Sequence, residues 1–218
     1  MEATITQHES KRKLLDAALH VIRSKGYTGT RVEDICEAAG LTKGSFFHHF
    51  KSKEDLALAA AEYWNTVTGE LFASAEYRRL SDPLDRLLAY IDLRKSLLRG
   101  KLPEFTCLLG TMVQEVYETH PQLRDACEQN ISGHAATLEP DIAAAMQKYN
   151  VHGNWTPRSL ALYTQAVIQG AFILAKARGG PEVAETMIDH LRRYVEMLFH
   201  RNEDQERGQA SQFQEEKR

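Results

Sequence analysis

The sequence predicts an all-α protein of about nine helices: an N-terminal domain of three helices with a helix-turn-helix, and a larger helical C-terminal domain. Apolar residues recur at helical spacing along most of the 218 residues, and alternating β-branched runs are few. A short turn containing Gly40 separates two brief helical patterns near the N-terminus. Pro and Gly mark the ends of the later helical patterns.

The N-terminal domain is predicted to hold three helices. The first spans about residues 10–25 and ends at the following glycine. The second begins at a capping box formed by Thr30 and Glu33. Gly40 allows the backbone of a tight turn, and the third helix spans about residues 43–50. A helix-turn-helix of this kind places its second helix in the major groove of DNA.

Capping residues and prolines divide the remainder of the chain into further helices. Ser52 caps a fourth helix, and Asp82 followed by Pro83 opens another. A single long helix is predicted from Pro121 up to a loop at residues 150–155. The predicted helices beyond the first three therefore cover about residues 53–71, 83–98, 104–118, 121–149, 157–178 and 182–198.

The helix predicted at residues 157–178 is apolar on nearly all sides, which requires burial on two faces. One face would cover the domain's own core and the other a second subunit, with Gly170 allowing close approach of the partner helix. A large monomeric core is the alternative. The residues predicted at this homodimer interface are Val167, Gly170, Ala171, Leu174, Leu191, Tyr194 and Leu198.

The distribution of charge favours a specific nucleic-acid site over general coating. The formal net charge of the chain is −3. Residues 40–53, however, contain lysines and histidines and no acidic residue. Phosphate binding depends on where the charge lies, so a locally basic segment on a mildly acidic chain fits binding to particular DNA sites.

The composition also predicts a cytoplasmic protein with no membrane partner. The first ten residues are polar and lack the apolar core of a signal peptide. No run approaches the roughly 18 apolar residues that span a bilayer. The three cysteines, Cys36, Cys107 and Cys127, are odd in number and widely spaced, which indicates reduced thiols.

One segment resembles a known family. The run Leu-Thr-Lys-Gly-Ser-Phe-Phe-His-His-Phe-Lys-Ser-Lys-Glu-Asp-Leu at residues 41–56 is similar to the signature of the TetR-like bacterial transcriptional repressors. The resemblance extends over roughly the first 60 residues, including Ala17-Ala18 and Gly26-Tyr27. It departs at Phe47, where the family usually has Tyr, so the DNA-backbone contact of that hydroxyl is not carried over.

The basic segment supplies the predicted DNA contacts. Lys43 and Ser45 stand at the front of the second helix of the motif, and Gly44 lets the backbone approach the groove. His48 is the candidate for variable base readout, although a solvated face is the alternative. The predicted DNA-binding residues are Arg31, Thr42, Lys43, Gly44, Ser45, Phe47, His48, His49, Lys51 and Lys53.

The resemblance implies a dimer that binds a palindromic double-stranded DNA operator and is released by a small-molecule effector. The two DNA-binding domains of the dimer (residues 1–52, called the heads below), about one DNA turn apart, roughly 34–36 Å or a larger multiple, would bind the two half-sites. The effector is expected to bind in the C-terminal domain and to be hydrophobic or aromatic, with ordinary core as the default alternative for each candidate contact. The candidate effector residues are Tyr90, Phe105, Cys107, Met112, His134, Tyr163, Gln169 and Phe172.

Two other modes of regulation stay open at this point. Cys107, which follows a proline break near a helix start, could sense electrophiles or oxidants, or could be a small buried hydrophobe. A DNA-binding or DNA-organising protein that needs no ligand is the other alternative.

An enzyme is not predicted. His48-His49 lie on the basic segment and Glu54 directly follows it, where no pocket is implied, and there is no nucleophile elbow, phosphate loop or pair of catalytic carboxylates. No cofactor and no metal site are expected, because the histidines are scattered. The predicted domains are residues 1–52 for DNA binding, residues 53–200 for effector binding and dimerisation, and a disordered tail at residues 201–218.

Overall fold

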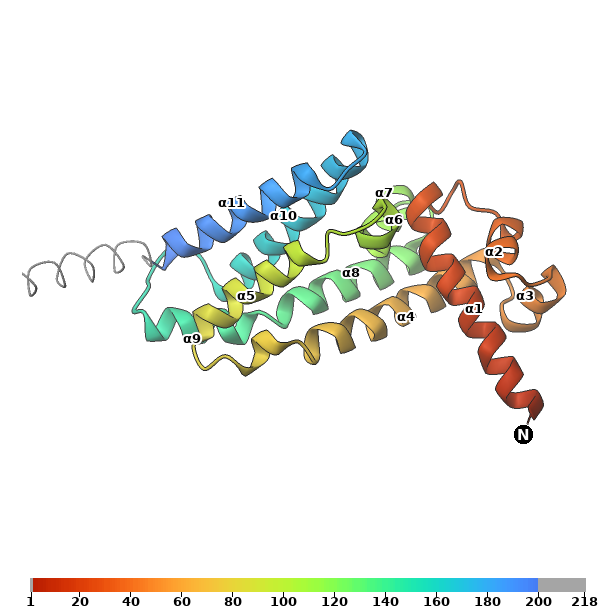
Figure 1. The fold of residues 1–218 in the computed structure, drawn as a ribbon, viewed down its shortest axis with the longest axis horizontal. Helices are drawn as coiled ribbons and strands as arrows, with labels where there is room; N and C mark the ends of the chain where they lie inside the picture. The colour runs from red at the N-terminus through yellow and green to blue at the C-terminus, as the bar shows by residue number, and fades with distance from the viewer. Residues whose placement is uncertain (1, 200–218) are drawn as a thin grey trace, which may run out of the picture. The chain divides into compact units, whose positions relative to one another are not determined.

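The computed structural model describes the backbone of residues 2–199 and the side chains from His8 to Phe199. This part of the chain is helical and contains no strand, in agreement with the predicted fold class (Figure 1). The elements are α1 (Glu2–Lys25), α2 (Val32–Ala39), α3 (Lys43–His49), α4 (Lys53–Ala73), the 3-10 helix η1 (Glu76–Arg79), α5 (Pro83–Ser96), α6 (Leu102–Phe105), α7 (Leu108–Val116), α8 (Pro121–Ala136), α9 (Glu139–Lys148), α10 (Pro157–Arg178) and α11 (Glu182–Leu198). The predicted disordered tail lies outside the described residues.

The chain forms two compact units, each built from several segments. Unit 1 contains residues 1–75, 99–134 and 175–181, and unit 2 contains the remainder. The helix-turn-helix therefore shares a unit with α4, α6, α7 and most of α8. The functional division at residues 52 and 53 stays a prediction.

The structure confirms predicted local signals both at the start and at the end of helices. The Ser52 hydroxyl accepts the N–H of Asp55 at 3.0 Å at the start of α4. Gly40 ends α2 with a φ of 63°, in the left-handed region that favours glycine.

The predicted Thr30 capping box is wrong. Arg31 caps α2, and its N–H donates to the Asp34 carboxylate at 2.8 Å. The Thr30 hydroxyl instead donates to the Gly26 carbonyl at 2.6 Å, because Thr30 is buried in the turn before the helix.

The single long helix predicted after Pro121 is also wrong. The chain forms α8 and α9, with a break at Thr137 and Leu138. Pro140 stands in the first turn of α9 and has no N–H to continue the ladder from α8. The apolar stripe persists across the break, since Leu123, Leu138 and Ile142 are all buried.

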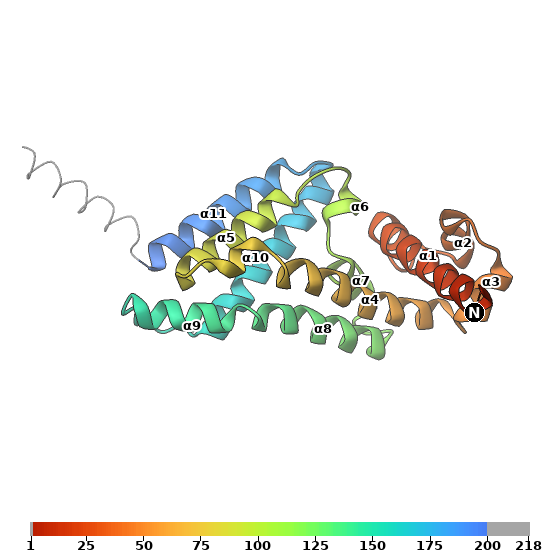
Figure 2. The same cartoon turned by 60° about the horizontal axis from the view of Figure 1, so that its bottom comes forward.

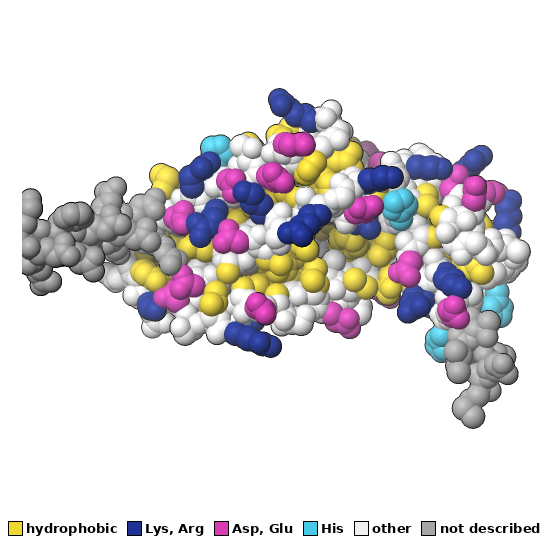
Figure 3. All heavy atoms as spheres, viewed as in Figure 1, with side chains coloured by type: hydrophobic (Ala, Val, Ile, Leu, Met, Phe, Trp, Pro, Cys, Tyr) yellow, Lys and Arg dark blue, Asp and Glu magenta, His cyan; other side chains and the backbone are white. Residues whose placement is uncertain are grey.

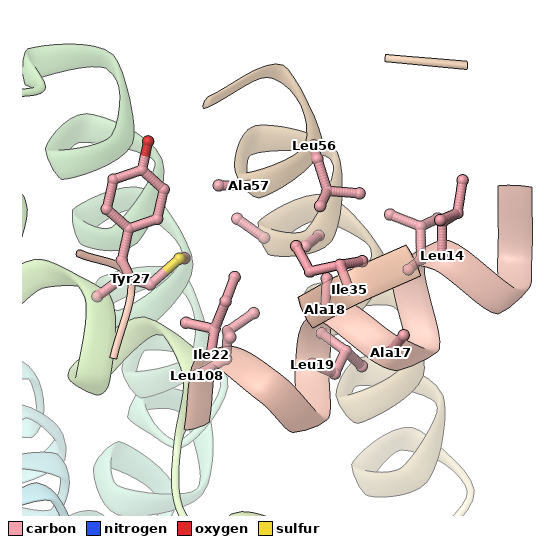
Figure 4. Packing of buried hydrophobic residues seen from close by; sticks show 14 of the residues in the cluster. Leu14, Ala17, Ala18, Leu19, Ile22, Tyr27, Ile35, Leu56, Ala57 and Leu108 are labelled. Atoms are coloured by element: carbon pink, nitrogen blue, oxygen red, sulfur yellow. The ribbon is translucent and has the colours of Figure 1, made fainter. Parts of the chain in front are cut away.

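Unit 1 has one hydrophobic cluster that joins the helix-turn-helix to α7 and α8. Figure 4 shows Leu14, Ile35 and Leu56 meeting between α1, α2 and α4, while Leu108 from α7 packs beside Ile22. The other buried members include Phe46, Phe50, Met112, Val116, Leu123 and Cys127. The head therefore has no core separate from α7 and α8.

Unit 2 is built around α5, which packs against α9 and α11 (Figure 2). Its interior contains Tyr90, Ile168 and Leu191, each almost fully buried. Ion pairs of 2.7 Å join Arg86 to Asp141 and Lys95 to Asp189 at its edges.

Helix α10 has one buried face and one exposed face within the chain. The buried face includes Leu160, Ile168 and Ala171, whereas Leu162 and Leu174 are exposed. By length and composition alone, α10 is apolar enough to cross a membrane, but 44% of that stretch is buried inside the protein. A core helix of a folded protein passes the same test, so the prediction of a chain without a membrane span is not altered.

We expect Asp82→Ala to weaken unit 2 in a pH-dependent way. The Asp82 carboxylate accepts the N–H of Leu84 at 2.8 Å and bonds to Tyr149 at 2.8 Å and to Lys148. Burial opposes its ionisation, but these hydrogen bonds lower its pKa to about 2. Loss of the cap should reduce the free energy of unfolding by about 1 kcal/mol at pH 7.

The pKa of Asp82 is lower in the folded chain than its ordinary value of 3.8, so its contribution is complete above about pH 4. The contribution is lost as the pH falls through about 2. Urea unfolding of both proteins between pH 2 and 7 measures this difference. A gap between wild type and Asp82→Ala that is equally large at pH 2 would contradict the assignment.

Candidate nucleic-acid interface

The candidate interface is built on α3 and the turn that precedes it. Thr42 caps α3, and its hydroxyl oxygen accepts the N–H of Ser45 at 3.2 Å. Phe46 and Phe50 are buried and hold α3 on the core, with ring centroids 5.8 Å apart. The remaining side chains of this short helix face outward or sit at its edge.

The front of α3 is open to solvent. A Cβ at Gly44 would meet only the Thr42 hydroxyl, at an ordinary contact distance of 3.6 Å. Phe47 is 57% exposed, whereas the other phenylalanines in the described part of the chain are buried. Lys43, Gly44, Phe47 and His48 are exposed and Ser45 is half-buried, so they form one accessible face.

This face is less purely basic than the sequence of residues 40–53 suggests. The Lys43 ammonium pairs with the Glu33 carboxylate of α2, and this hydrogen bond lowers the pKa of Glu33. Figure 3 likewise shows acidic side chains among the Lys, Arg and His side chains over the helix-turn-helix. A phosphate that bound Lys43 would therefore compete with Glu33.

Besides Lys43, the predicted DNA contacts Lys53 and His49 also have hydrogen-bond partners inside unit 1. The Lys53 ammonium donates to the carbonyls of Tyr27 and Thr30, both at 2.9 Å, and lies 4.3 Å from the centre of the Tyr27 ring. Burial lowers the pKa of Lys53, and the charge of Glu115 opposes that effect. His49 shares a hydrogen bond of 2.7 Å with the Ser10 hydroxyl, and burial lowers its pKa.

Arg31 and Lys51 remain at the margins of the face. Arg31 has a largely exposed side chain and a long ion pair of 3.5 Å with Asp34. The Asp34 carboxylate also binds Lys25 at 3.0 Å, and its hydrogen bonds with the Arg31 N–H and Lys25 lower its pKa to about 2. The Lys51 side chain is exposed, while its backbone N–H donates to Asp55 at 2.8 Å.

The candidate effector residues fall into two groups. Unit 2 holds Tyr90, Tyr163, Gln169 and Phe172, of which Tyr90 and Phe172 are buried, Gln169 is half-buried and Tyr163 is exposed. Unit 1 holds the remaining candidates: Phe105, Cys107, Met112 and His134. Met112 belongs to the hydrophobic cluster of unit 1, and the His134 ring contacts that of Phe72 in a tilted arrangement, with ring centroids 4.7 Å apart.

Two buried polar residues in unit 2 were not identified from the sequence. The Gln165 amide donates to the Tyr90 hydroxyl at 3.0 Å. The Tyr77 ring lies 5.9 Å from that of Tyr90, and the Arg78 guanidinium lies 5.2 Å from the centre of the Tyr77 ring. The buried Tyr77 hydroxyl makes no hydrogen bond of normal geometry among the described residues, although Arg78 is near enough to favour its ionised form. Burial raises the pKa of Tyr77. The spacing of these residues along the chain contains no signal that they meet.

Cys107 is half-buried and begins α7, where its Sγ accepts the N–H of Gly110 at 3.4 Å. Two cations, Arg23 and Lys176, are close enough to interact electrostatically with its thiol. Lys176 donates to the Thr111 hydroxyl at 2.6 Å, and Arg23 donates to the Thr106 carbonyl at 3.3 Å. Within the described residues, no three His, Cys, Asp or Glu side chains are grouped as a metal site.

Comparison with known proteins places both halves of the chain in one family. Residues 14–60 match the model of bacterial regulatory proteins of the tetR family, and residues 83–191 match a tetracyclin repressor-like C-terminal domain. The chain is similar to the HTH-type transcriptional repressor NemR of Escherichia coli K12, with 27% identity over 199 residues, 87% of this chain and 96% of that protein.

Solved structures share the fold. A TetR-family regulator from Agrobacterium tumefaciens has a TM-score of 0.77 at 20% identity, covering 86% of this chain and 98% of that one. A cysteine-substituted variant of the regulator CifR, complexed with 26-base-pair operator DNA, has a TM-score of 0.70 at 17% identity, covering 84% of this chain and 94% of that one.

Proposed function

Because the chain belongs to the TetR family of bacterial regulatory proteins, we propose that it is a dimeric repressor that binds a palindromic operator through α3 and is released by a small molecule. The open front of α3, with exposed Lys43, Gly44 and Phe47, is the observation that carries the proposal. NemR is named a repressor, and a cysteine-substituted variant of CifR has a solved complex with operator DNA. Action on DNA supports a cytoplasmic location and a regulatory rather than an enzymatic role.

The partners of each side chain divide the proposed DNA contacts by role. Lys43, Ser45 and His48 would face base edges, while Arg31, Thr42 and Lys51 would contact phosphates. Phe47 would pack on a sugar or a thymine methyl group. We assign Lys53 and His49 to holding the head together, because their polar groups already bind Tyr27, Thr30 and Ser10.

We propose the exposed face of α10, together with α11, as the dimer interface. Tyr163 of α10 and Tyr194 of α11 are both exposed, and their ring centroids lie 5.1 Å apart. Ala171 and Leu191 are almost fully buried in their own subunit, so we assign them to the core and leave them out. The exposed apolar side chains of this face are Leu162, Tyr163, Ile173, Leu174, Tyr194 and Met197.

For the effector, we propose a neutral aromatic ligand with a hydrogen-bonding oxygen, bound in unit 2. The buried Tyr77 hydroxyl, which makes no hydrogen bond of normal geometry among the described residues, and the Tyr90–Gln165 pair would supply its polar contacts, since a buried donor without a good hydrogen bond is costly. The second candidate is electrophile sensing by Cys107, because the thiol is half-buried beside the cations Arg23 and Lys176, and reactive cysteines lie in partly exposed, electropositive surroundings.

Selection of bound DNA from a random duplex pool, followed by release assays with a small-molecule library, tests the function as a whole. We expect a palindrome with regularly spaced half-sites and at least one compound that releases it. A palindrome that no compound releases would favour regulation without a ligand. Failure to enrich any sequence would contradict DNA readout by α3.

Lys43→Ala should weaken operator binding by about 1–3 kcal/mol and relax sequence preference near its contact. Glu33→Gln should strengthen binding, because it removes the carboxylate that pairs with Lys43. Arg158→Ala, which removes an exposed cation from unit 2, is the matched control. Fluorescence anisotropy across salt concentrations measures both effects, and equal affinities for wild type and Lys43→Ala would remove Lys43 from the site.

Gly170→Leu should give a folded monomer. A Cβ at Gly170 has no neighbour within 4 Å among the described residues, so we expect the added side chain to obstruct a partner rather than the subunit's own core. Sedimentation should show the dimer lost while far-ultraviolet circular dichroism stays unchanged. A stable dimer of the variant would place the interface elsewhere.

Tyr77→Phe and Cys107→Ser distinguish the two effector classes. If the ligand binds in unit 2, Tyr77→Phe should need roughly tenfold more aromatic ketone or phenol for release, and Cys107→Ser should behave as wild type. If Cys107 is the sensor, Cys107→Ser should keep operator binding but resist N-ethylmaleimide and diamide. Titrations of operator release with each probe measure the responses of both variants. If a variant responds like wild type, the residue that it replaces does not have the role proposed for it.

A further inference from the structure

The turn between α1 and α2 is held from two sides by opposite charges. Glu115, near the end of α7, accepts the N–H of Tyr27 at 3.2 Å through Oε1 and the N–H of Thr28 at 2.7 Å through Oε2. Lys53, at the start of α4, donates to the carbonyls of Tyr27 and Thr30. The carboxylate therefore holds the amides of the turn, and the ammonium holds its carbonyls.

The turn is shaped for this contact. Gly26 has a φ of 79°, and a Cβ there would collide with Oε1 of Glu115. Tyr27 is buried, and the ring of His120 packs edge-on against it with centroids 5.3 Å apart. Glycine at residue 26 thus serves both the backbone conformation and the approach of the carboxylate.

The helix-turn-helix begins directly after this turn. Thr30 ends the turn, Arg31 caps α2, and Gly40 leads from α2 to α3. α2 and α3 are short helices of 8 and 7 residues, so their orientation depends on anchors at their ends and on the cluster beneath them. Cys107 caps the opposite, N-terminal end of α7. A helix of nine residues is about 13 Å long, so Cys107 lies about that distance from the end of α7 that carries Glu115.

We propose that Glu115 is a positioning residue through which α7 sets the orientation of the helix-turn-helix on the operator. Charge-assisted hydrogen bonds are stronger than neutral ones and are directional, so a carboxylate that accepts two successive backbone amides fixes both the distance and the orientation of the turn relative to α7. A shift of α7 would carry Tyr27, Thr28 and the start of α2 with it. The inference rests on the proposed operator binding and adds the contact that transmits the position of α7.

The test compares Glu115→Ala with Glu118→Ala, an exposed acid three residues further along the chain, as the matched control. Each protein is titrated on the selected palindrome and on two versions with one base pair added to or removed from its centre. Hydrogen exchange of the Tyr27 and Thr28 amides reports directly on their hydrogen bonds to Glu115, and circular dichroism reports on folding.

We expect Glu115→Ala to bind the best operator roughly tenfold more weakly while binding the altered spacings almost as wild type does. Its preference for one spacing should therefore collapse, and the two amides should exchange faster. Glu118→Ala should match wild type in all three measurements.

A merely structural role predicts a different result. If Glu115 only stabilised the fold, Glu115→Ala would weaken all spacings by the same factor, and this outcome would overturn the proposal. Unchanged binding by Glu115→Ala would overturn it as well. If the wild type itself showed no preference for a palindrome, the proposed function would fail first, and the wild-type titration identifies that case separately.

Discussion

The structure depends on a hydrophobic cluster that the helix-turn-helix shares with helices far along the chain. Leu14, Ile35 and Phe46 of the head pack in the same cluster as Leu108 and Met112 of α7 and Leu123 of α8. Interiors of this kind are close-packed and adopt discrete arrangements more readily than they deform. The orientation of α3 is therefore tied to the positions of α7 and α8.

Because the helix-turn-helix shares its hydrophobic cluster with α7 and α8, a small coupling free energy is enough to regulate operator binding. A tenfold change in operator affinity requires about 1.4 kcal/mol of coupling. A ligand supplies it only by binding one arrangement better than the other. The polar contacts around the cluster, such as Arg23 on the Thr106 carbonyl, are directional and therefore distinguish arrangements that apolar packing alone would tolerate.

The sequence predicted what local chemistry decides. Short segments of the sequence determine the fold class, the caps at Ser52 and Asp82 and the turn at Gly40, and the structure confirms all of them. The Thr30 cap was mistaken because Thr30 and Arg31 are both plausible starts and a tertiary position, burial in the turn, decided between them. Pro140 carried the signal for the break after α8, but the continuous apolar stripe concealed it.

The candidate site was predictable in outline only. The open face of α3 follows from the motif, whereas the partners of Lys53 and His49 come from residues 23 to 39 positions away. Lysine on a basic segment carries no local mark that separates a phosphate contact from a structural one. The same holds for Glu115, whose partners lie 87 and 88 residues earlier, and for the meeting of Tyr90 with Gln165.

The interleaving of the two units limits how this protein can be rearranged. The chain passes between them repeatedly, since unit 1 takes in residues 99–134 and 175–181 besides the first 75. A helix-turn-helix domain cut out at residue 52 would leave the apolar surfaces of Ile22, Ile35 and their neighbours uncovered. Transfer of its DNA specificity to another regulator is therefore expected to succeed by exchanging the exposed residues of α3, or by exchanging the head together with α7 and α8 as one body.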